Sequence, residues 1–91
     1  MNGASTVCDL VIDGNSFWTT EPNRIRLANV FAPEEGEPGY EEAKNSLKRL
    51  IQSRFIEYKP LGTSSDFIIA EVFVDGKSVN QQMRLEGYNI S

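Results

Sequence analysis

The sequence contains no histidine and a single cysteine, Cys8. Imidazole acid–base catalysis is therefore excluded, and a zinc site is nearly excluded, because zinc in proteins is held mainly by histidine and cysteine. A lone cysteine cannot form an internal disulfide. Because Cys8 lies in an apolar run, we expect a small buried side chain rather than a nucleophile. A metal bound by this chain would be a hard cation such as calcium or magnesium, held through oxygen ligands.

Long apolar segments and an excess of positive charge are also absent. No run approaches the ~20 apolar residues that cross a bilayer, and residues 1–6 have neither the basic nor the apolar part of a signal peptide. We therefore expect a soluble chain with no membrane partner, in a compartment that the sequence does not indicate. The formal net charge of -4 opposes broad nucleic-acid binding, because phosphate contacts depend on clustered lysine and arginine.

What is present predicts one globular domain spanning residues 1–91. With 40% hydrophobic and 24% charged residues, the composition is that of a folded protein. Apolar periodicity predicts five strands and two helices. The strands are expected at residues 7–12, 16–20, 24–30, 55–59 and 67–74, and the helices at residues 40–52 and 79–86. Five strands with a helix between the third and the fourth is the order of an oligonucleotide/oligosaccharide-binding (OB) barrel, an α+β fold that is mainly β and here ends in a short helix.

Turn and capping signals add detail to this expectation. Asp13-Gly14-Asn15 is a tight-turn signal, so the first two strands are expected to form a hairpin. Strict alternation in the first strand places Cys8 and Val11 on opposite faces. Residues 60–66 are expected to form a polar loop. Ser78, followed three residues later by a glutamine, predicts a capping box for the last helix.

The third strand and the loop after it carry residues suited to phosphate chemistry. Alternation places Arg24 and Arg26 on one face of the strand, and Glu34 heads the loop after an Ala-Pro break. A guanidinium neutralises charge on phosphate oxygens, and a carboxylate takes a proton from attacking water, so the pair suits phosphodiester hydrolysis. The alternative is a surface arginine that happens to lie near a loop glutamate.

Several motifs occur along the chain in a recognisable order. They are Asp13-Gly14-Asn15-Ser16-Phe17, the segment 24–34, Glu41-Glu42-Ala43, the segment 70–80 and Glu86-Gly87-Tyr88. In this order and at these separations they resemble the staphylococcal (thermonuclease-like) nuclease family, over residues 7–88. The resemblance implies an OB barrel, and for members with an intact site it implies calcium-dependent hydrolysis of DNA and RNA.

The resemblance also implies roles for single residues. Family members use two aspartates as calcium ligands, a glutamate proposed as general base and two arginines that stabilise the pentacoordinate phosphate. The first arginine matches Arg26 and the glutamate matches Glu34. Asn15 and Phe31 stand in place of the two aspartates, and Phe67 stands in place of the second arginine. Asn15 can still offer a neutral carbonyl to calcium, but Phe31 offers no ligand, so no cofactor is expected unless the chain is an active nuclease.

With these departures, the resemblance implies a catalytically impaired domain that acts as an interaction module for a protein or, weakly, for nucleic acid. Phe31 and Phe67 beside Arg24 and Arg26 would form a shallow surface for base stacking. Two alternatives remain open. One is an active phosphodiesterase that uses Arg26 and Glu34 with a divalent metal ion. The other is a structural domain that presents its acidic loop to a basic partner.

Further expectations concern contacts and partners. Without a metal ion, Arg26 is expected to pair with Glu34 and to hold the acidic loop, residues 34–42, against the sheet. Phe31 and Phe67 are expected to cover the emptied site together. Family members continue into another helix beyond the last one predicted here, so the resemblance implies uncovered apolar surface near that helix. We therefore expect a homodimer or docking onto a neighbouring domain.

Overall fold

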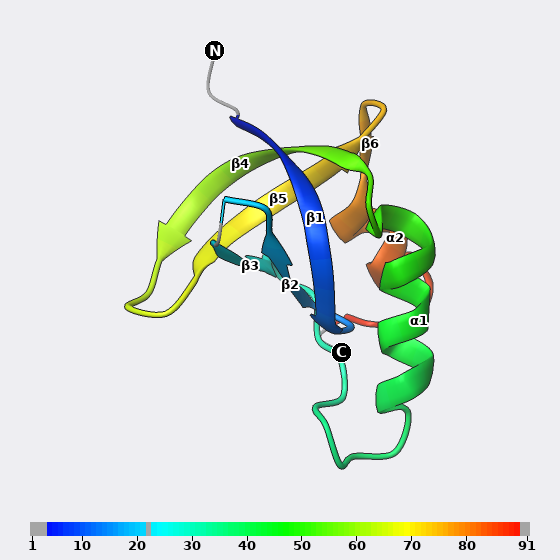
Figure 1. Ribbon diagram of the computed structural model, residues 1–91. Coiled ribbons are helices and arrows are strands. Elements are labelled where there is room, and N and C mark those ends of the chain that lie inside the picture. Colours follow the sequence, from blue (N-terminus) through cyan, green and yellow to red (C-terminus); the bar gives the residue numbers. More distant parts are fainter. Residues whose placement is uncertain (1–3, 22, 90–91) are drawn as a thin grey trace.

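A computed structural model describes residues 4–21 and 23–89 and contains six strands and two helices (Figure 1). In chain order these are β1 (Ala4–Asp13), β2 (Ser16–Thr19), β3 (Arg24–Leu27), α1 (Tyr40–Ile51), β4 (Phe55–Thr63), β5 (Ile68–Val74), β6 (Lys77–Ser78) and α2 (Val79–Leu85). The five expected strands and both expected helices are confirmed. The additional strand, β6, was not predicted because two residues are too few to show alternation.

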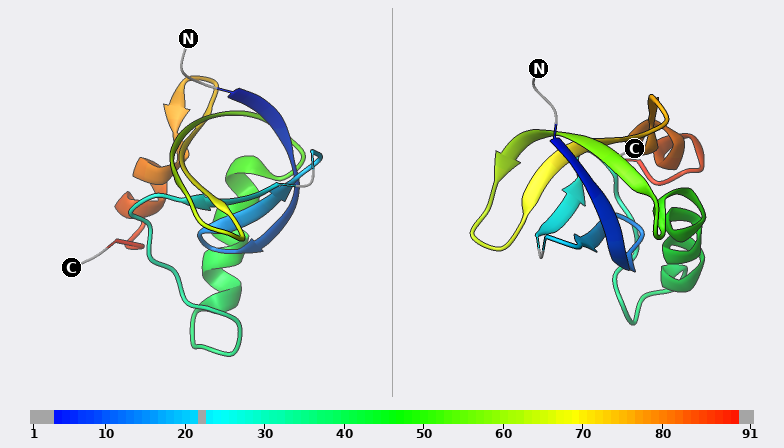
Figure 2. Two further views of the ribbon diagram at one scale, coloured as in Figure 1. Left: turned by 90° about the vertical axis from the view of Figure 1, so that its left-hand side faces the viewer. Right: turned by 45° about the horizontal axis from the view of Figure 1, so that its top comes forward.

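The first five strands close into a barrel. β1 pairs with β2 and β4, β2 pairs with β3, and β4 pairs with β5, all in antiparallel fashion. The barrel closes through the parallel pairing of β3 with β5, in which Ile25 lies opposite Ile68. The left view of Figure 2 looks into this ring of strands. With α1 between β3 and β4, the fold is the expected OB-like α+β fold, mainly β.

β1 departs from the alternation expected of it. Cys8 and Val11 are both buried in the core, and Asp9 and Leu10 between them are both exposed. The pairing of β1 with β2 shifts register between Cys8 and Leu10, which marks a β-bulge. A bulge adds one unpaired residue, so the residues after it face the opposite side from the one alternation predicts. The prediction that Cys8 and Val11 lie on opposite faces was therefore wrong.

Several strand boundaries also differ from the prediction, most at the start of β1 and at the ends of β4 and β3. β4 runs through the predicted polar loop as far as Thr63, and its pairing with β5 shifts between Pro60 and Gly62. The shift accommodates a proline, which has no N–H group to donate to a strand ladder. β3 ends at Leu27, earlier than expected, and Asn29 after it has a φ of 57°, which an extended strand does not allow.

The two helices lie next to each other at one end of the barrel (Figure 2, right). α1 buries Ala43, Leu47 and Ile51 at helical spacing in the core. α2 begins at its predicted cap, where the Ser78 side chain accepts a hydrogen bond from the backbone N–H of Gln81 at 3.1 Å. Within the described part of the chain, neither helix has the length and apolar character that crossing a bilayer requires.

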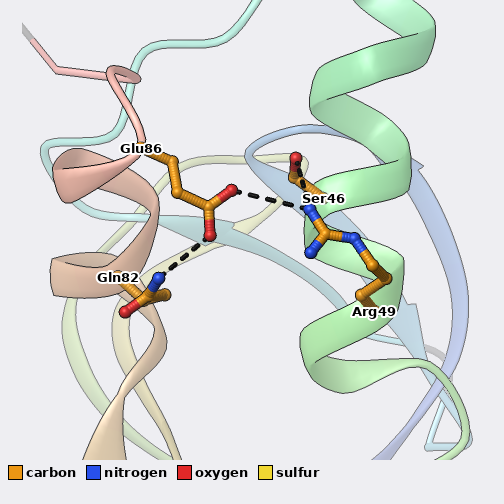
Figure 3. A network of polar contacts seen from close by, with 4 residues as sticks. All are labelled: Ser46, Arg49, Gln82 and Glu86. Atoms are coloured by element: carbon orange, nitrogen blue, oxygen red, sulfur yellow. Dashed lines mark hydrogen bonds and ion pairs between the residues drawn. The ribbon is translucent and has the colours of Figure 1, made fainter.

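Polar side chains connect the two helices (Figure 3). The Nη2 of Arg49 in α1 lies 3.7 Å from Oε1 of Glu86 and also donates to the Ser46 hydroxyl at 3.1 Å. The Nε2 of Gln82 donates to the other carboxylate oxygen of Glu86 at 3.0 Å. Because the side chain of Arg49 is 66% exposed, water screens this ion pair, and we expect it to stabilise the fold only slightly.

Asn80 in α2 is fully buried and ties the helix to the barrel. Its Oδ1 accepts a hydrogen bond from the backbone N–H of Val72 at 2.9 Å, and its Nδ2 donates to the carbonyls of Ala28 at 3.0 Å and Ala70 at 3.1 Å. On this edge, β5 pairs with β3 as far as Ala70 and with β6 from Phe73 onward. The Asn80 amide therefore fills the gap between two strand partners.

Candidate functional site

A depression of about 340 Å³ gathers most of the residues singled out from the sequence. It lies where the β1–β2 turn, β3 and the following loop meet. Its lining includes five of those residues, Asn15, Arg24, Arg26, Phe31 and Glu34. The sixth, Phe67, lines two neighbouring hollows. The fold thus brings the predicted site residues into one region of the surface.

Phe67 lies against both arginines of β3. Alternation along β3 turns Arg24 and Arg26 away from the core, in which Ile25 and Leu27 are buried. Phe67 directly precedes β5, so the parallel pairing of β3 with β5 brings its ring to these arginines. The Cζ atom of Arg24 is 6.0 Å from the centre of the ring, and that of Arg26 is 5.3 Å from it. These distances are typical of cation–π contacts.

The expected ion pair between Arg26 and Glu34 is not formed. No carboxylate of the described residues forms an ion pair with Arg24 or Arg26. The acidic loop bonds to itself instead, because the Glu34 N–H donates to Oε1 of Glu37 at 2.7 Å and the Glu37 N–H donates to the Glu34 carbonyl at 2.9 Å. The prediction was wrong because Arg26 lies over Phe67 and the loop holds its own shape.

The amide nitrogen and the backbone of Asn15, the candidate metal ligand, form local hydrogen bonds. The residue is 6% exposed, its Nδ2 donates to the carbonyl of Val30 at 3.0 Å, and its own carbonyl accepts the N–H of Leu27 at 2.8 Å. The neighbouring Asp13 accepts the Asn15 N–H at 3.0 Å and the Ser16 hydroxyl at 2.8 Å through Oδ1. Asn15 therefore joins the hairpin turn to the segment after β3, a role that the sequence did not indicate.

Asp13 is a carboxylate of the depression that sequence reasoning missed as a site residue. The signal was present, because Asp13 opens the Asp-Gly-Asn turn motif. Asp13, Glu34 and Glu37 all line the depression. Across residues 4–21 and 23–89, however, no three cysteine or carboxylate side chains come close enough together to hold a metal ion. The depression carries both signs of charge, with acidic groups beside the two arginines.

Exposed aromatic rings extend the surface beyond each arginine. Trp18, which sequence reasoning missed, is 39% exposed and lies opposite Arg24 in the β2–β3 pairing, so the two side chains share a face. Trp18, Arg24 and Phe67 line a hollow of about 410 Å³. Phe31 is 55% exposed and lines another hollow, of about 320 Å³, with Arg26 and Phe67. We name Trp18, Arg24, Phe67, Arg26 and Phe31 the arginine–aromatic face.

Cys8 lies in the core, away from this face. Its side chain is 1% exposed. The pKa of the thiol is raised to about 11, chiefly by burial. A hydrogen bond from the Ser53 backbone lowers the pKa in part, and the charge of Asp9 raises it. Because the thiolate is the nucleophilic form, Cys8 is unreactive near neutral pH. The expectation of a buried cysteine is confirmed.

Comparison with known proteins adds no family assignment. The chain matches no protein-family model, and no curated protein matches it in sequence. What the chain does must therefore be inferred from the arginine–aromatic face and the depression beside it.

Proposed function

We propose that this chain is a noncatalytic, nuclease-like barrel that binds short single-stranded nucleic acid weakly through its arginine–aromatic face. The observation that carries the proposal is that Arg24 and Arg26 lie over the Phe67 ring and form no ion pair with a described residue. Guanidinium groups held at a surface without a carboxylate partner suit the phosphates of a nucleic-acid strand. Exposed aromatic rings beside them suit its bases.

Each part of the face has a counterpart in a single strand. A guanidinium presents five N–H donors in a rigid plane. Neither Arg24 nor Arg26 forms an ion pair with a described carboxylate, so the outer N–H groups of these side chains keep donor capacity for a phosphate. Trp18 and Phe31 present rings to solvent, and rings of this kind stack on any base. We therefore expect single strands to bind better than duplexes, in which the bases are already stacked.

Nearby negative charge limits the affinity. Asp13, Glu34 and Glu37 line the depression next to Arg26, and the whole chain has a formal net charge of -4. These carboxylates repel the phosphates that the arginines attract. We therefore expect a dissociation constant on the order of 10⁻⁴ M at physiological salt, the weak end of nonspecific binding.

The proposed lack of catalysis follows from three residues that depart from the nuclease pattern, Asn15, Phe31 and Phe67. A staphylococcal-nuclease-like site would need a calcium ligand where Phe31 stands and a second arginine where Phe67 stands. The third departure, Asn15, uses its amide nitrogen to bind the Val30 carbonyl. Removing one group that stabilises the transition state typically lowers the rate ~10²–10³-fold. We infer a degenerate relative of that family that binds without calcium.

Fluorescence of Trp18, the single tryptophan of the chain, provides a direct test. Titration with oligothymidylate or oligouridylate of about eight nucleotides, within the site sizes of single OB folds, is expected to quench this emission to saturation. The quenching should occur in EDTA, because no metal ion takes part. Two phosphate contacts predict that the logarithm of the binding constant falls with the logarithm of salt concentration with a slope of about -1.4.

Substitutions separate specific binding from general attraction. Arg26→Ala removes a phosphate contact and Phe31→Ala removes a stacking ring, so each is expected to weaken binding about 10-fold. Lys59→Ala, at an exposed position of β4, is the matched control and should bind as the unchanged protein does. If the affinity is the same for all three variants, or if millimolar oligonucleotide leaves Trp18 emission unchanged, the proposed face does not bind nucleic acid.

A second candidate function is metal-dependent phosphodiester hydrolysis by Arg26 and Glu34. It is favoured by the observation that both residues line one depression together with Asp13 and Glu37. In this function Arg26 would stabilise the phosphate and Glu34 would take the proton from water. Calcium-dependent cleavage of single-stranded DNA or RNA that both Arg26→Ala and Glu34→Ala abolish would establish it. Cleavage that persists in both variants would come from a contaminating nuclease.

A further inference from the structure

A second concave surface lies between the two helices and the β5–β6 hairpin. It is a groove of about 290 Å³ with an aliphatic floor formed by Leu50, Val74 and Val79. Val79 is buried and the other two are half-buried. The groove shares no lining residue with the hollows of the arginine–aromatic face. An inference from this groove is therefore independent of the proposed function.

The rim of the groove is mainly positive, whereas the whole chain has a negative net charge. Arg49, Arg54 and Lys77 line it against one carboxylate, Asp75, whereas the chain has 13 acidic and 9 basic residues. The ion pair with Glu86 partly neutralises Arg49 (Figure 3). Arg54 and Lys77 are exposed and form no ion pair with a described residue. The rim therefore has two positively charged side chains without an ion-pair partner among the described residues, beside the aliphatic side chains of the groove.

We propose that this groove binds a short acidic segment of a partner protein. One aliphatic side chain of that segment lies on the floor against Leu50, Val74 and Val79. Its acidic neighbours lie beside Arg54 and Lys77. Burial of the aliphatic side chain supplies affinity, and the charge complementarity sets orientation and speeds association.

Other occupants fit the groove less well. None of the described residues that line it is aromatic, so a nucleic acid would find no ring there on which to stack its bases. A basic segment would place its charges beside Arg54 and Lys77, and like charges across an interface repel. A neutral apolar segment would leave both cations without a counterpart.

The test follows methyl resonances of Leu50, Val74 and Val79 by NMR during titration of the full chain. The probe is a synthetic peptide with a central leucine flanked by aspartates and glutamates. Two comparison peptides replace the leucine by serine or the acidic residues by lysine. We expect saturable shifts of these methyl resonances with the acidic leucine peptide, and at least about tenfold weaker binding of the other two.

Charge reversal at the rim identifies the site of binding. The double variant Arg54→Glu/Lys77→Glu changes exposed side chains only and is expected to weaken peptide binding at least about tenfold. The double variant Lys44→Glu/Lys59→Glu changes the net charge equally away from the groove and should bind as the unchanged chain does.

Several outcomes would overturn the proposal. They are equal binding of the acidic leucine peptide by both double variants, equal binding of the serine peptide, and no methyl shift at millimolar peptide. An oligonucleotide that shifts the same methyl resonances would assign the groove to nucleic acid instead. Self-association in sedimentation experiments that Arg54→Glu/Lys77→Glu abolishes would identify a second copy of the chain as the occupant.

Discussion

Gly14 occupies a point at which three segments meet too closely for any side chain. A Cβ atom at this position would lie 2.6 Å from the Cβ of Ala43 in α1 and 2.7 Å from the Cβ of Ala32 in the loop after β3. Neither Cβ can move unless its backbone moves. We expect Gly14→Ala to lower the free energy of unfolding in urea by about 1–3 kcal/mol. Gly62→Ala, where a Cβ would meet no atom of the described residues within 4 Å, is the control and should lower the free energy of unfolding much less.

Cys8 makes the stability of the fold depend on alkaline pH. Burial raises the pKa of its thiol from 9.0 to about 11 in the folded chain, so the unfolded chain loses this proton first as the pH rises. The stabilisation that the protonated Cys8 thiol gives to the folded chain is therefore complete below pH 9.0 and is lost as the pH rises through about 11. By linkage, this loss amounts to roughly 2–3 kcal/mol.

Urea unfolding over this alkaline range, compared with Cys8→Ala, measures the effect. All other ionisable side chains are the same in the two proteins, so their contributions cancel in the comparison. We expect the difference in unfolding free energy between the two proteins to shrink as the pH rises from 9.0 to about 11. If that difference stays constant, the thiol of Cys8 does not titrate differently in the folded and unfolded chains.

Among the elements, β5 depends on a side chain from α2 to complete its edge. Asn80→Ala would leave the Val72 N–H without its acceptor in a site that is 0% exposed at residue 80, and would leave the Ala28 carbonyl with a 3.4 Å hydrogen bond from Nη1 of Arg84. We expect the free energy of unfolding to fall by roughly 2–4 kcal/mol and the Val72 amide to lose protection from hydrogen exchange. Asn45→Ala, on the exposed face of α1, should change stability by less than about 0.5 kcal/mol. Unchanged Val72 protection would contradict this role.

The elements could be predicted where a single segment carries its own signal. α1 was located because Ala43, Leu47 and Ile51 recur on one helical face. The bulge in β1 could not be predicted, because its position is set by pairing with β2 and not by any residue in β1. The end of β4 was missed for the same reason, since β5 holds Pro60 and the residues after it in the sheet.

At the scale of the whole molecule, most residues of the site could be predicted, but Asp13 and Trp18 were missed and the ion pair expected between Arg26 and Glu34 was wrong. Asn15, Arg26 and Glu34 meet because the hairpin, β3 and its loop adjoin in sequence as well as in space. The partner of Arg26 is Phe67, which arrives only when the barrel closes. The groove between the helices combines α1, β5, β6 and α2, so no single segment could reveal its basic rim.

The parallel pairing that closes the barrel also constrains how the chain folds. Ile25 of β3 cannot pair until Ile68 of β5, which is distant in the sequence, has come close to it. Such long-range closure requires the loss of loop entropy before contacts form, which slows folding. During synthesis on a ribosome, β1 to β3 emerge first, and the outer edge of β3 stays open to other strands until β5 appears. For that interval, the nascent chain is a target for chaperones and proteases.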